Sequence, residues 1–249
     1  MRALEGIRGL DLTIWQQGPM TTAMLADWGA DVIKIEGPDS PDPGRSLMRY
    51  EVTPGGPNAY FETHNRNKRG IVLDLKSDGG RQVFYRLVEK ADVVAQNFRP
   101  GVNDRLGIDY QTLSGLNPRL IYCSASGFGL KGPDAARPAL DPLAQARGGL
   151  MSVTGEPETP PTRTFNGFAD QISAFLLSYG IAIRAGLIVG FDHDDTTIFD
   201  TQYDFVMQSC LPSVTLSLLK AIPGTRLWRR LRNEGRVLDI TKLKGDSKT

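Results

Sequence analysis

The residue types that could do chemistry in this 249-residue chain stand in four polar segments, each placed just after a predicted strand or just before a predicted helix. They are WQQGP (15–19), NRNKRGIVLDLK (65–76), NFRPGVNDRLG (97–107) and the run 145–170, which contains GGLMSVTGEP and ends on Asp170. A helix that begins beside a strand end offers unpaired N–H groups to an anion. Taken singly, each segment is a weak signal, and Arg66, Lys68 and Arg69 are by default solvated surface cations.

Several common kinds of site lack the residues they need. The chain has no G-x-G-x-x-G after a strand and no G-x-x-x-x-G-K-[ST], which argues against a dinucleotide site of the usual type and a phosphate-binding loop. Its two histidines, His64 and His193, give little material for a histidine-based triad or a metal centre. Cys123 and Cys210 form neither a disulfide framework nor a metal-ligand spacing. The sequence therefore predicts no metal site.

Composition and charge favour an ordinary globular protein. The chain is 40% hydrophobic and 23% charged, with a net charge of +1, so it lacks the basic excess of nucleic-acid-binding domains. Its N-terminus has no apolar signal region, which predicts a cytoplasmic location. The run from Ile172 to Phe191 carries a single charge, Arg184, and is about as long as a membrane span. A buried helix running into a buried strand gives the same pattern, and we favour that interpretation.

The elements that must position these segments alternate between strand and helix. Apolar runs predict strands at 9–13, 31–36, 70–75, 92–98 and 119–124, and helices from Pro19 to Gly29 and over 78–91. Such alternation is typical of a parallel, wound α/β sheet with helices on both faces. Ligands of these sheets bind beyond the carboxyl ends of the strands.

The remaining segments are less regular. We expect a long loop over 37–69, polar or glycine- and proline-rich loops over 127–142 and 155–167, and an apolar helix over 171–183. From residue 185 the pattern restarts as strand 187–191, helix 196–209, strand 214–219 and helix 224–236. The sequence thus predicts two domains, 1–184 and 185–249, the second a short βαβα segment.

Long stretches of the first domain resemble the class III coenzyme A (CoA) transferases, the formyl-CoA and carnitine-CoA transferase type. The stretches are LEGIRGLDLT, ADWGADVIKIE, NRNKRGIVLDLKS, LVEKADVVAQNFRPG, LNPRLIYCSASGFG and QARGGLMSVTGEP, in family order and spacing. The resemblance covers residues 1–184 and implies a Rossmann-like N-terminal part of such an enzyme. It implies acyl-CoA and a carboxylic acid as substrates, with no tightly bound cofactor.

The resemblance also implies roles for six residues. Asp170 matches the family's nucleophile, which forms an aspartyl-CoA thioester. Its alternative role is that of a helix N-cap before Gln171. The attack requires an ionised carboxylate, and an aspartate of ordinary pKa is ionised at neutral pH. The family's CoA contacts match Gln16, Leu73, Lys76, Asn97 and Arg105, although Leu73 could equally be strand core.

Two positions depart from the family pattern. Gly37 stands where a basic residue usually follows IKIE, which would weaken the grip on the nucleotide end of CoA. Leu140, before Asp141, stands where an aromatic residue is common.

The second predicted domain resembles a different family. Residues 185–239 resemble the late barrel segment of cobalamin-binding radical S-adenosylmethionine proteins, but the chain has no C-x-x-x-C-x-x-C motif for their iron–sulfur cluster. The resemblance therefore implies a chimera of two partial domains. Class III enzymes are interlocked homodimers with a second domain and a glycine-rich loop over the nucleophile. We expect that a chain without them cannot form that dimer and has impaired activity.

The function expected from the sequence is transfer of CoA between an acyl-CoA and a carboxylic acid. One alternative is a non-catalytic CoA-binding or merely folded remnant of a gene fusion. A second is a fragment of a radical enzyme without its cluster. The acyl group and the acceptor acid are not specified by the sequence.

Overall fold

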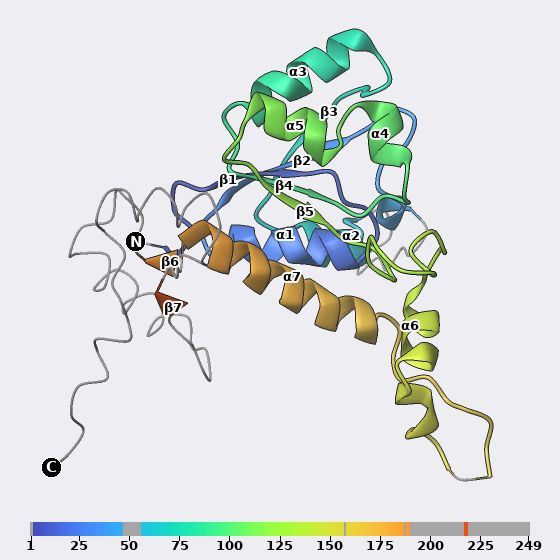
Figure 1. Cartoon of the computed structure of the whole chain (residues 1–249). Helices are drawn as coiled ribbons and strands as arrows, with labels where there is room; N and C mark the ends of the chain where they lie inside the picture. The colour runs from blue at the N-terminus through green and yellow to red at the C-terminus, as the bar shows by residue number, and fades with distance from the viewer. Residues whose placement is uncertain (1, 47–55, 157, 187, 190–216, 219–249) are drawn as a thin grey trace, which may run out of the picture. The chain divides into compact units, whose positions relative to one another are not determined.

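The computed structural model of the protein describes residues 2–46, 56–156, 158–186, 188–189 and 217–218. The chain divides into two compact units, 1–187 and 188–249. The first unit contains a five-stranded sheet of order β3-β2-β1-β4-β5 (Figure 1), in which each paired neighbour is parallel. Its strands are β1 (Arg8–Asp11), β2 (Asp31–Glu36), β3 (Arg69–Val72), β4 (Val93–Gln96) and β5 (Ile121–Ser124). The predicted parallel α/β fold is confirmed.

Helices cover both faces of the sheet. Figure 1 shows α3 (Asp78–Val88), α4 (Val102–Leu106) and α5 (Tyr110–Leu116) on one face. On the other face lie α1 (Gln17–Asp27), α2 (Ala59–Asn65) and α7 (Phe168–Gly186), with α1 packed against both α2 and α7. The short helix α6 (Asp141–Arg147) contacts α7 and is followed by the 3₁₀ turn η2 (Leu150–Ser152).

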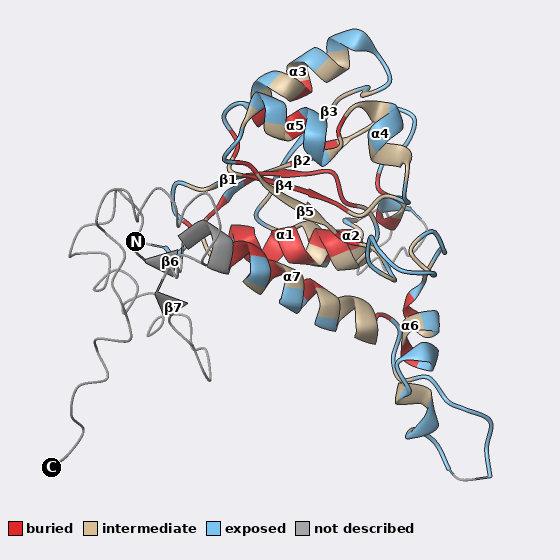
Figure 2. Ribbon diagram, in the orientation of Figure 1, coloured by how far each residue is buried: buried red, intermediate tan, exposed pale blue. Residues whose placement is uncertain are grey.

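Alternation along the strands builds one core on each side of the sheet. Leu10 and Ile35 pack with Phe84 of α3 in one apolar cluster, whereas Val32 packs with Leu25 of α1 in the other. Figure 2 shows that α1 and much of β1, β2 and β4 are buried, whereas β5 is intermediate and β3 is exposed. Because side chains alternate between faces, Asp11 and Lys34 are placed on the α1 side of the sheet, beneath the start of that helix.

Several segments differ from the expectation. The predicted loop over 37–69 contains α2 and the 3₁₀ turn η1 (Pro43–Arg45), each begun by a polar side chain that accepts a backbone hydrogen bond. These caps are Asp42 for η1 and Asn58 for α2. Helices α4, α5 and α6 are too short, at five to seven residues, to show a clear helical period. The predicted helix over 171–183 begins three residues earlier and ends three residues later.

The second unit is described only at two short strands. β6 (Ile188–Val189) pairs in parallel with β7 (Ser217–Leu218), at positions where strands were predicted. The predicted helices 196–209 and 224–236 lie outside the described residues, as do His193 and Cys210. Within the described residues, no helix combines the length and apolar character that a membrane crossing requires.

Candidate active site

The strand order reverses between β1 and β4, and the chain segments that leave these strands are tied together there. Asn97 follows β4, and its side-chain amide makes two hydrogen bonds to the backbone of Ile14, both 2.9 Å. One is accepted from the N–H of Ile14 and one is donated to its carbonyl. Asn97 therefore fixes the turn between β1 and α1 at the place where wound sheets bind ligands.

The turn that follows Ile14 holds an unusual backbone conformation. Trp15 has φ of 69°, in the left-handed region that a side chain with a Cβ rarely occupies. Its N–H donates to Oδ1 of Asp42 at 2.9 Å, and the same oxygen accepts from the N–H of Gly44. Asp42 is almost completely buried and its other oxygen lies 3.0 Å from Lys34 Nζ. The strained turn is thus held by a buried carboxylate.

A second buried carboxylate, Asp11, lies at the end of β1. Lys68 Nζ lies 2.8 Å from Asp11 Oδ2 and also donates to the carbonyls of Pro19 and His64. Burial acts to raise the pKa of Asp11, but the charges of Lys68 and Lys34 outweigh it and lower that pKa to about 2. Burial lowers the pKa of Lys68 to about 8. The expectation that Lys68 is a solvated cation is wrong: it joins the start of α1, the end of α2 and the end of β1.

The other two cations of that segment are on the surface as expected. Arg66 pairs with Asp27 and Arg69 pairs with Asp31, and both guanidinium groups are substantially exposed.

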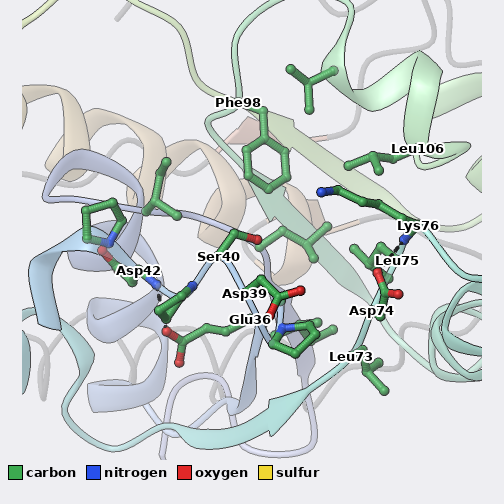
Figure 3. A pocket seen from close by; sticks show the side chains of 18 of the residues that line it. Glu36, Asp39, Ser40, Asp42, Leu73, Asp74, Leu75, Lys76, Phe98 and Leu106 are labelled. Carbon is green, nitrogen blue, oxygen red and sulfur yellow. Dashed lines mark hydrogen bonds between the residues drawn. The ribbon is translucent and has the colours of Figure 1, made fainter.

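A cavity of about 450 Å³ opens beyond the carboxyl ends of β2, β3 and β4 (Figure 3). Three predicted CoA contacts line it: Leu73 and Lys76 after β3, and Arg105 on α4. Figure 3 shows the Lys76 side chain reaching into the cavity on the side of Phe98. Gly37, the departure from the family pattern, is also part of the wall.

The acidic residues of the wall are partly neutralised. Glu36 forms an ion pair with Arg45 at 2.6 Å. Burial acts to raise the pKa of Glu36, yet the hydrogen bonds and charge of Arg45 lower it overall. Asp42 is paired with Lys34. The wall also contains Asp39 and Asp74, and its cations Lys76 and Arg105 are side chains of the kind that binds phosphate.

Asp170 lies in the first turn of α7, as its third residue, so the alternative role as an N-cap before Gln171 is wrong. The carboxylate of Asp141 caps this helix instead, since its Oδ1 accepts from the N–H groups of Ala169 and Asp170 at 2.7 and 3.3 Å. Burial, and then the negative charge of Asp141, raise the pKa of Asp170 to about 6. That is well above the ordinary value on which the sequence-based expectation rested.

Gln16 connects the β1–α1 turn to this helix. Its Nε2 lies 3.5 Å from the carbonyl oxygen of Gly167, directly before α7. The next residue, Gln17, donates to Oγ of Ser173 at 2.8 Å. These contacts bring the beginnings of α1 and α7 together, so that Asp170 is placed close to the turn that Asn97 also holds.

The six predicted residues thus fall into two groups. Leu73, Lys76 and Arg105 share the cavity wall, whereas Gln16, Asn97 and Asp170 are absent from it and belong to the adjoining β1–α1–α7 junction. Sequence reasoning missed Asp141 and Gln145. Their spacing of four residues on a helix, an acid followed by an amide, is the signal that could have found them. Among the described residues, no group of three or more His, Cys, Asp or Glu side chains could hold a metal ion.

Comparison with known proteins settles the family of the chain. The family described as CoA-transferase family III matches residues 4–188. The chain belongs to this family. It is 43% identical to an acetyl-CoA:oxalate CoA-transferase of Acetobacter aceti, over 83% of this chain and 54% of that protein. It is 42% identical to a succinyl-CoA:mesaconate CoA-transferase of Haloarcula hispanica, over 73% of this chain and 47% of that protein.

Solved structures of similar proteins share the fold. A CAIB/BAIF family protein from Brucella suis superposes with a TM-score of 0.67 at 39% identity, covering 73% of this chain and 48% of that one. The protein Rv3272 of Mycobacterium tuberculosis gives a TM-score of 0.68 at 31% identity, covering 84% of this chain and 58% of that one. The chain spans about half the length of the class III relatives it matches.

The matches to class III CoA-transferases do not stop uniformly at the predicted domain boundary. Residues 1–184 are 184 of 249, so an alignment that covers 83% of the chain extends beyond residue 184. The boundary at 184 stays a prediction. The radical-enzyme resemblance of 185–239 and the chimera it implies find no support in these comparisons, and nearly all of that segment lies outside the described residues.

Proposed function

We propose that this chain binds the CoA portion of an acyl-CoA in the cavity beyond β2, β3 and β4 and presents Asp170 as the nucleophile of a CoA transfer to a carboxylic acid. The observation that carries the proposal is the cavity itself. Leu73, Lys76 and Arg105 come from two separate parts of the chain, and each matches a position at which the family contacts CoA. Their meeting in one wall of a class III chain supports a shared ligand.

The junction beside the cavity supports the role of Asp170. Gln16 and Asn97 are the other two expected contacts: Gln16, in the β1–α1 turn, contacts Gly167, and Asn97 holds the same turn through Ile14. The carboxyl group of Asp170 is partly buried and its pKa is raised to about 6. At pH 7 its ionised form exceeds the protonated form by about ten to one, so a partly desolvated carboxylate is present to attack.

The chemistry proposed follows from a carboxylate nucleophile. Asp170 attacks the thioester carbonyl, giving a mixed anhydride and free CoA thiolate. The thiolate attacks the aspartyl carbonyl, which gives an aspartyl-CoA thioester and releases the acyl group as a carboxylate. The acceptor carboxylate then attacks that thioester, and the thiolate returns to the acceptor's carbonyl, which restores Asp170. Each tetrahedral oxyanion needs hydrogen-bond donors. The N–H groups of Ala169 and Asp170 already donate to Asp141.

The matched part of this chain covers only about half of the length of the relatives named above, so the whole reaction is proposed for the class and not for these 249 residues alone. From these 249 residues we expect CoA binding with a dissociation constant in the millimolar range and little or no covalent adduct on Asp170. The interlocked homodimer of the family, the inability of this chain to form it, and a cytoplasmic location stay predictions. Light scattering after size exclusion would test the first two.

Titration calorimetry with CoA and with dephospho-CoA tests the binding. The control is Arg86→Ala, which removes an exposed cation of α3 outside the cavity wall. We expect heat of binding with both ligands for the unaltered chain and for the control. No heat with either ligand at millimolar concentration would remove the proposal.

Mass spectrometry after incubation with a short acyl-CoA and hydroxylamine tests the nucleophile, since hydroxylamine converts an aspartyl thioester or anhydride to a stable hydroxamate. Any label should map to Asp170 and vanish in Asp170→Asn, but persist in Asp109→Asn, where the exchanged carboxylate caps α5. A label on another residue in both variants contradicts the assignment. CoA binding with no label at all would favour the non-catalytic alternative for this chain.

A further inference from the structure

Two buried polar residues of α6 have no part in the proposed reaction, yet the side chain of each makes several hydrogen bonds. Asp141 is 8% exposed and Gln145, one turn later, is 2% exposed. Gln145 Nε2 donates to Asp141 Oδ2 at 2.7 Å and to the carbonyl of Phe165 at 3.2 Å. Its Oε1 accepts from the N–H and the hydroxyl of Thr164. Gln145 thus binds the loop that enters α7 and, at the same time, one oxygen of Asp141.

The other oxygen of Asp141 reaches the nucleophile's own backbone. Oδ1 accepts from the N–H of Ala169 at 2.7 Å and from that of Asp170 at 3.3 Å. Both carboxylate oxygens are therefore acceptors in this arrangement. An asparagine would place an N–H₂ donor on one side, either against the Gln145 amide or against the helix N–H groups. The hydrogen-bond pattern selects an aspartate, because only a carboxylate accepts on both sides.

We propose that Asp141, held in place by Gln145, is a positioning residue for Asp170: it fixes the first turn of α7 and sets a second negative charge beside the nucleophile. The inference rests on the proposed role of Asp170. Accepting from two N–H groups that have no partner within the helix orders the first turn of α7. The charge adds a second effect, since a neighbouring anion disfavours ionisation and makes the Asp170 carboxylate more basic, and a more basic carboxylate is a stronger nucleophile.

The surroundings of Asp170 single out Asp141 as the charge that matters. The residues at the start of α1 that contact this region, Gln16 and Gln17, are neutral. From α2, His64 Nε2 lies 3.4 Å from Gln171 Nε2, and burial lowers the pKa of His64 and so favours its neutral form. Of the charged groups in the described residues, Asp141 is the one that raises the pKa of Asp170 besides burial.

The test measures Asp170 directly, without acyl-CoA. The carboxyl pKa of Asp170 is read by NMR in chain labelled with ¹³C-aspartate, together with hydrogen exchange at the Ala169 and Asp170 amides. In Asp141→Asn, and in Asp141→Ser as a smaller neutral cap, we expect the Asp170 pKa to fall by about half a unit or more. The matched control, Asp109→Asn, removes a capping carboxylate from α5 and should leave the Asp170 pKa unchanged.

Gln145→Met separates the support of Asp141 from its charge, because the substitution removes the hydrogen bond from Gln145 and leaves the Asp141 carboxylate in place. We expect faster exchange at the Thr164 amide and at the Ala169 amide, because Asp141 loses its support. An Asp170 pKa that stays near 6 in both neutral variants of position 141, in chains that remain folded, would overturn the inference. So would unchanged exchange at Ala169 in Asp141→Ser and Gln145→Met. A hydroxamate on a residue other than Asp170 would remove Asp170 as the proposed nucleophile and leave these readings as they stand, so the two failures are distinguishable.

Discussion

The side-chain amide of Gln16 occupies the space that a Cβ atom on Gly167 would need. An added Cβ would lie 2.1 Å from Gln16 Nε2 and 2.4 Å from Oε1, and Gly167 also has φ of 85°. The residue before α7 is therefore glycine for two independent reasons, one in its backbone and one in its contact with a predicted CoA-binding side chain.

The first prediction separates these reasons. Gly167→Ala should lower the free energy of unfolding by about 1 kcal/mol through its positive φ, and should also displace the Gln16 amide and weaken CoA binding several-fold. Gly129→Ala is the control, because Gly129 has φ of 76° with open space around it. Urea unfolding should show a similar loss for both. Equal CoA affinity in the two variants by calorimetry would contradict a role for Gln16 in binding.

The second prediction concerns the buried charges. Lys68→Met leaves Asp11, which is fully buried, with Lys34 as its remaining cation, 3.9 Å away. Removing one partner of a buried pair costs about 3–5 kcal/mol, and we expect that loss in urea unfolding. Arg69→Ala removes an exposed partner of Asp31 and should cost about 1 kcal/mol or less. Equal losses in the two variants would show that Lys68 is not structurally distinct from the surface cations.

The third prediction follows from the low pKa of Asp11. Its pKa of about 2 in the folded chain lies below the ordinary 3.8, so its stabilising contribution is present above pH 3.8 and is lost as the pH falls through about 2. In Lys68→Met the folded-state pKa should rise and the acid-sensitive window should move upward. Unfolding midpoints measured between pH 2 and 5 for both chains check this. Parallel curves would contradict it.

The fourth prediction concerns Asp170, where the sign is opposite. Its folded-state pKa of about 6 exceeds the ordinary 3.8, so the folded chain binds more protons in that interval and loses stability as the pH rises through it. Asp170→Asn should therefore increase the free energy of unfolding at pH 7.5 by on the order of 1 kcal/mol, which is less than full linkage gives because the carboxyl group is only partly buried. The gain should shrink toward pH 4. A less stable variant at pH 7.5 would refute the raised pKa.

The fifth prediction concerns the cavity. Arg105→Ala should weaken CoA binding about tenfold, because a guanidinium that binds phosphate through two hydrogen bonds is lost. The same substitution at Arg86, which is exposed on α3 outside the wall, should change the affinity little. Calorimetry at low and high salt adds a check, since the contribution of Arg105 should fall as salt rises. Unchanged affinity in Arg105→Ala would remove it from the site.

Much of the sheet could be predicted from the sequence because its strands are short apolar runs between turn signals. The strand 31–36 was predicted to the residue, and the other four within a few residues. Lys68 could not be placed this way. Its burial depends on Asp11, 57 positions away, and on the ends of two helices, and no local pattern carries that information.

The candidate site, like the sheet, could be predicted only in part from the sequence. Asp170, Gln16 and the cavity residues were named through family resemblance, since each alone is an ordinary polar or apolar residue at a strand end. Asp141 and Gln145 were missed because α6 is a seven-residue helix in a glycine- and proline-rich stretch. The raised pKa of Asp170 is likewise a property of packing, since it comes from burial and from a carboxylate 29 positions earlier.

The central position of β1 in the sheet affects how the chain folds during synthesis. This strand is the centre of the sheet but the first to leave the ribosome, and the side that pairs with β4 waits for partners such as Asp92, 84 residues later. At 5–20 residues per second, synthesis of that interval takes about 4–17 s. During that time one edge of an apolar strand stays open to other nascent chains. Growing chains that end before Asp92 should therefore need chaperone protection, and those that extend past Ser124 should not.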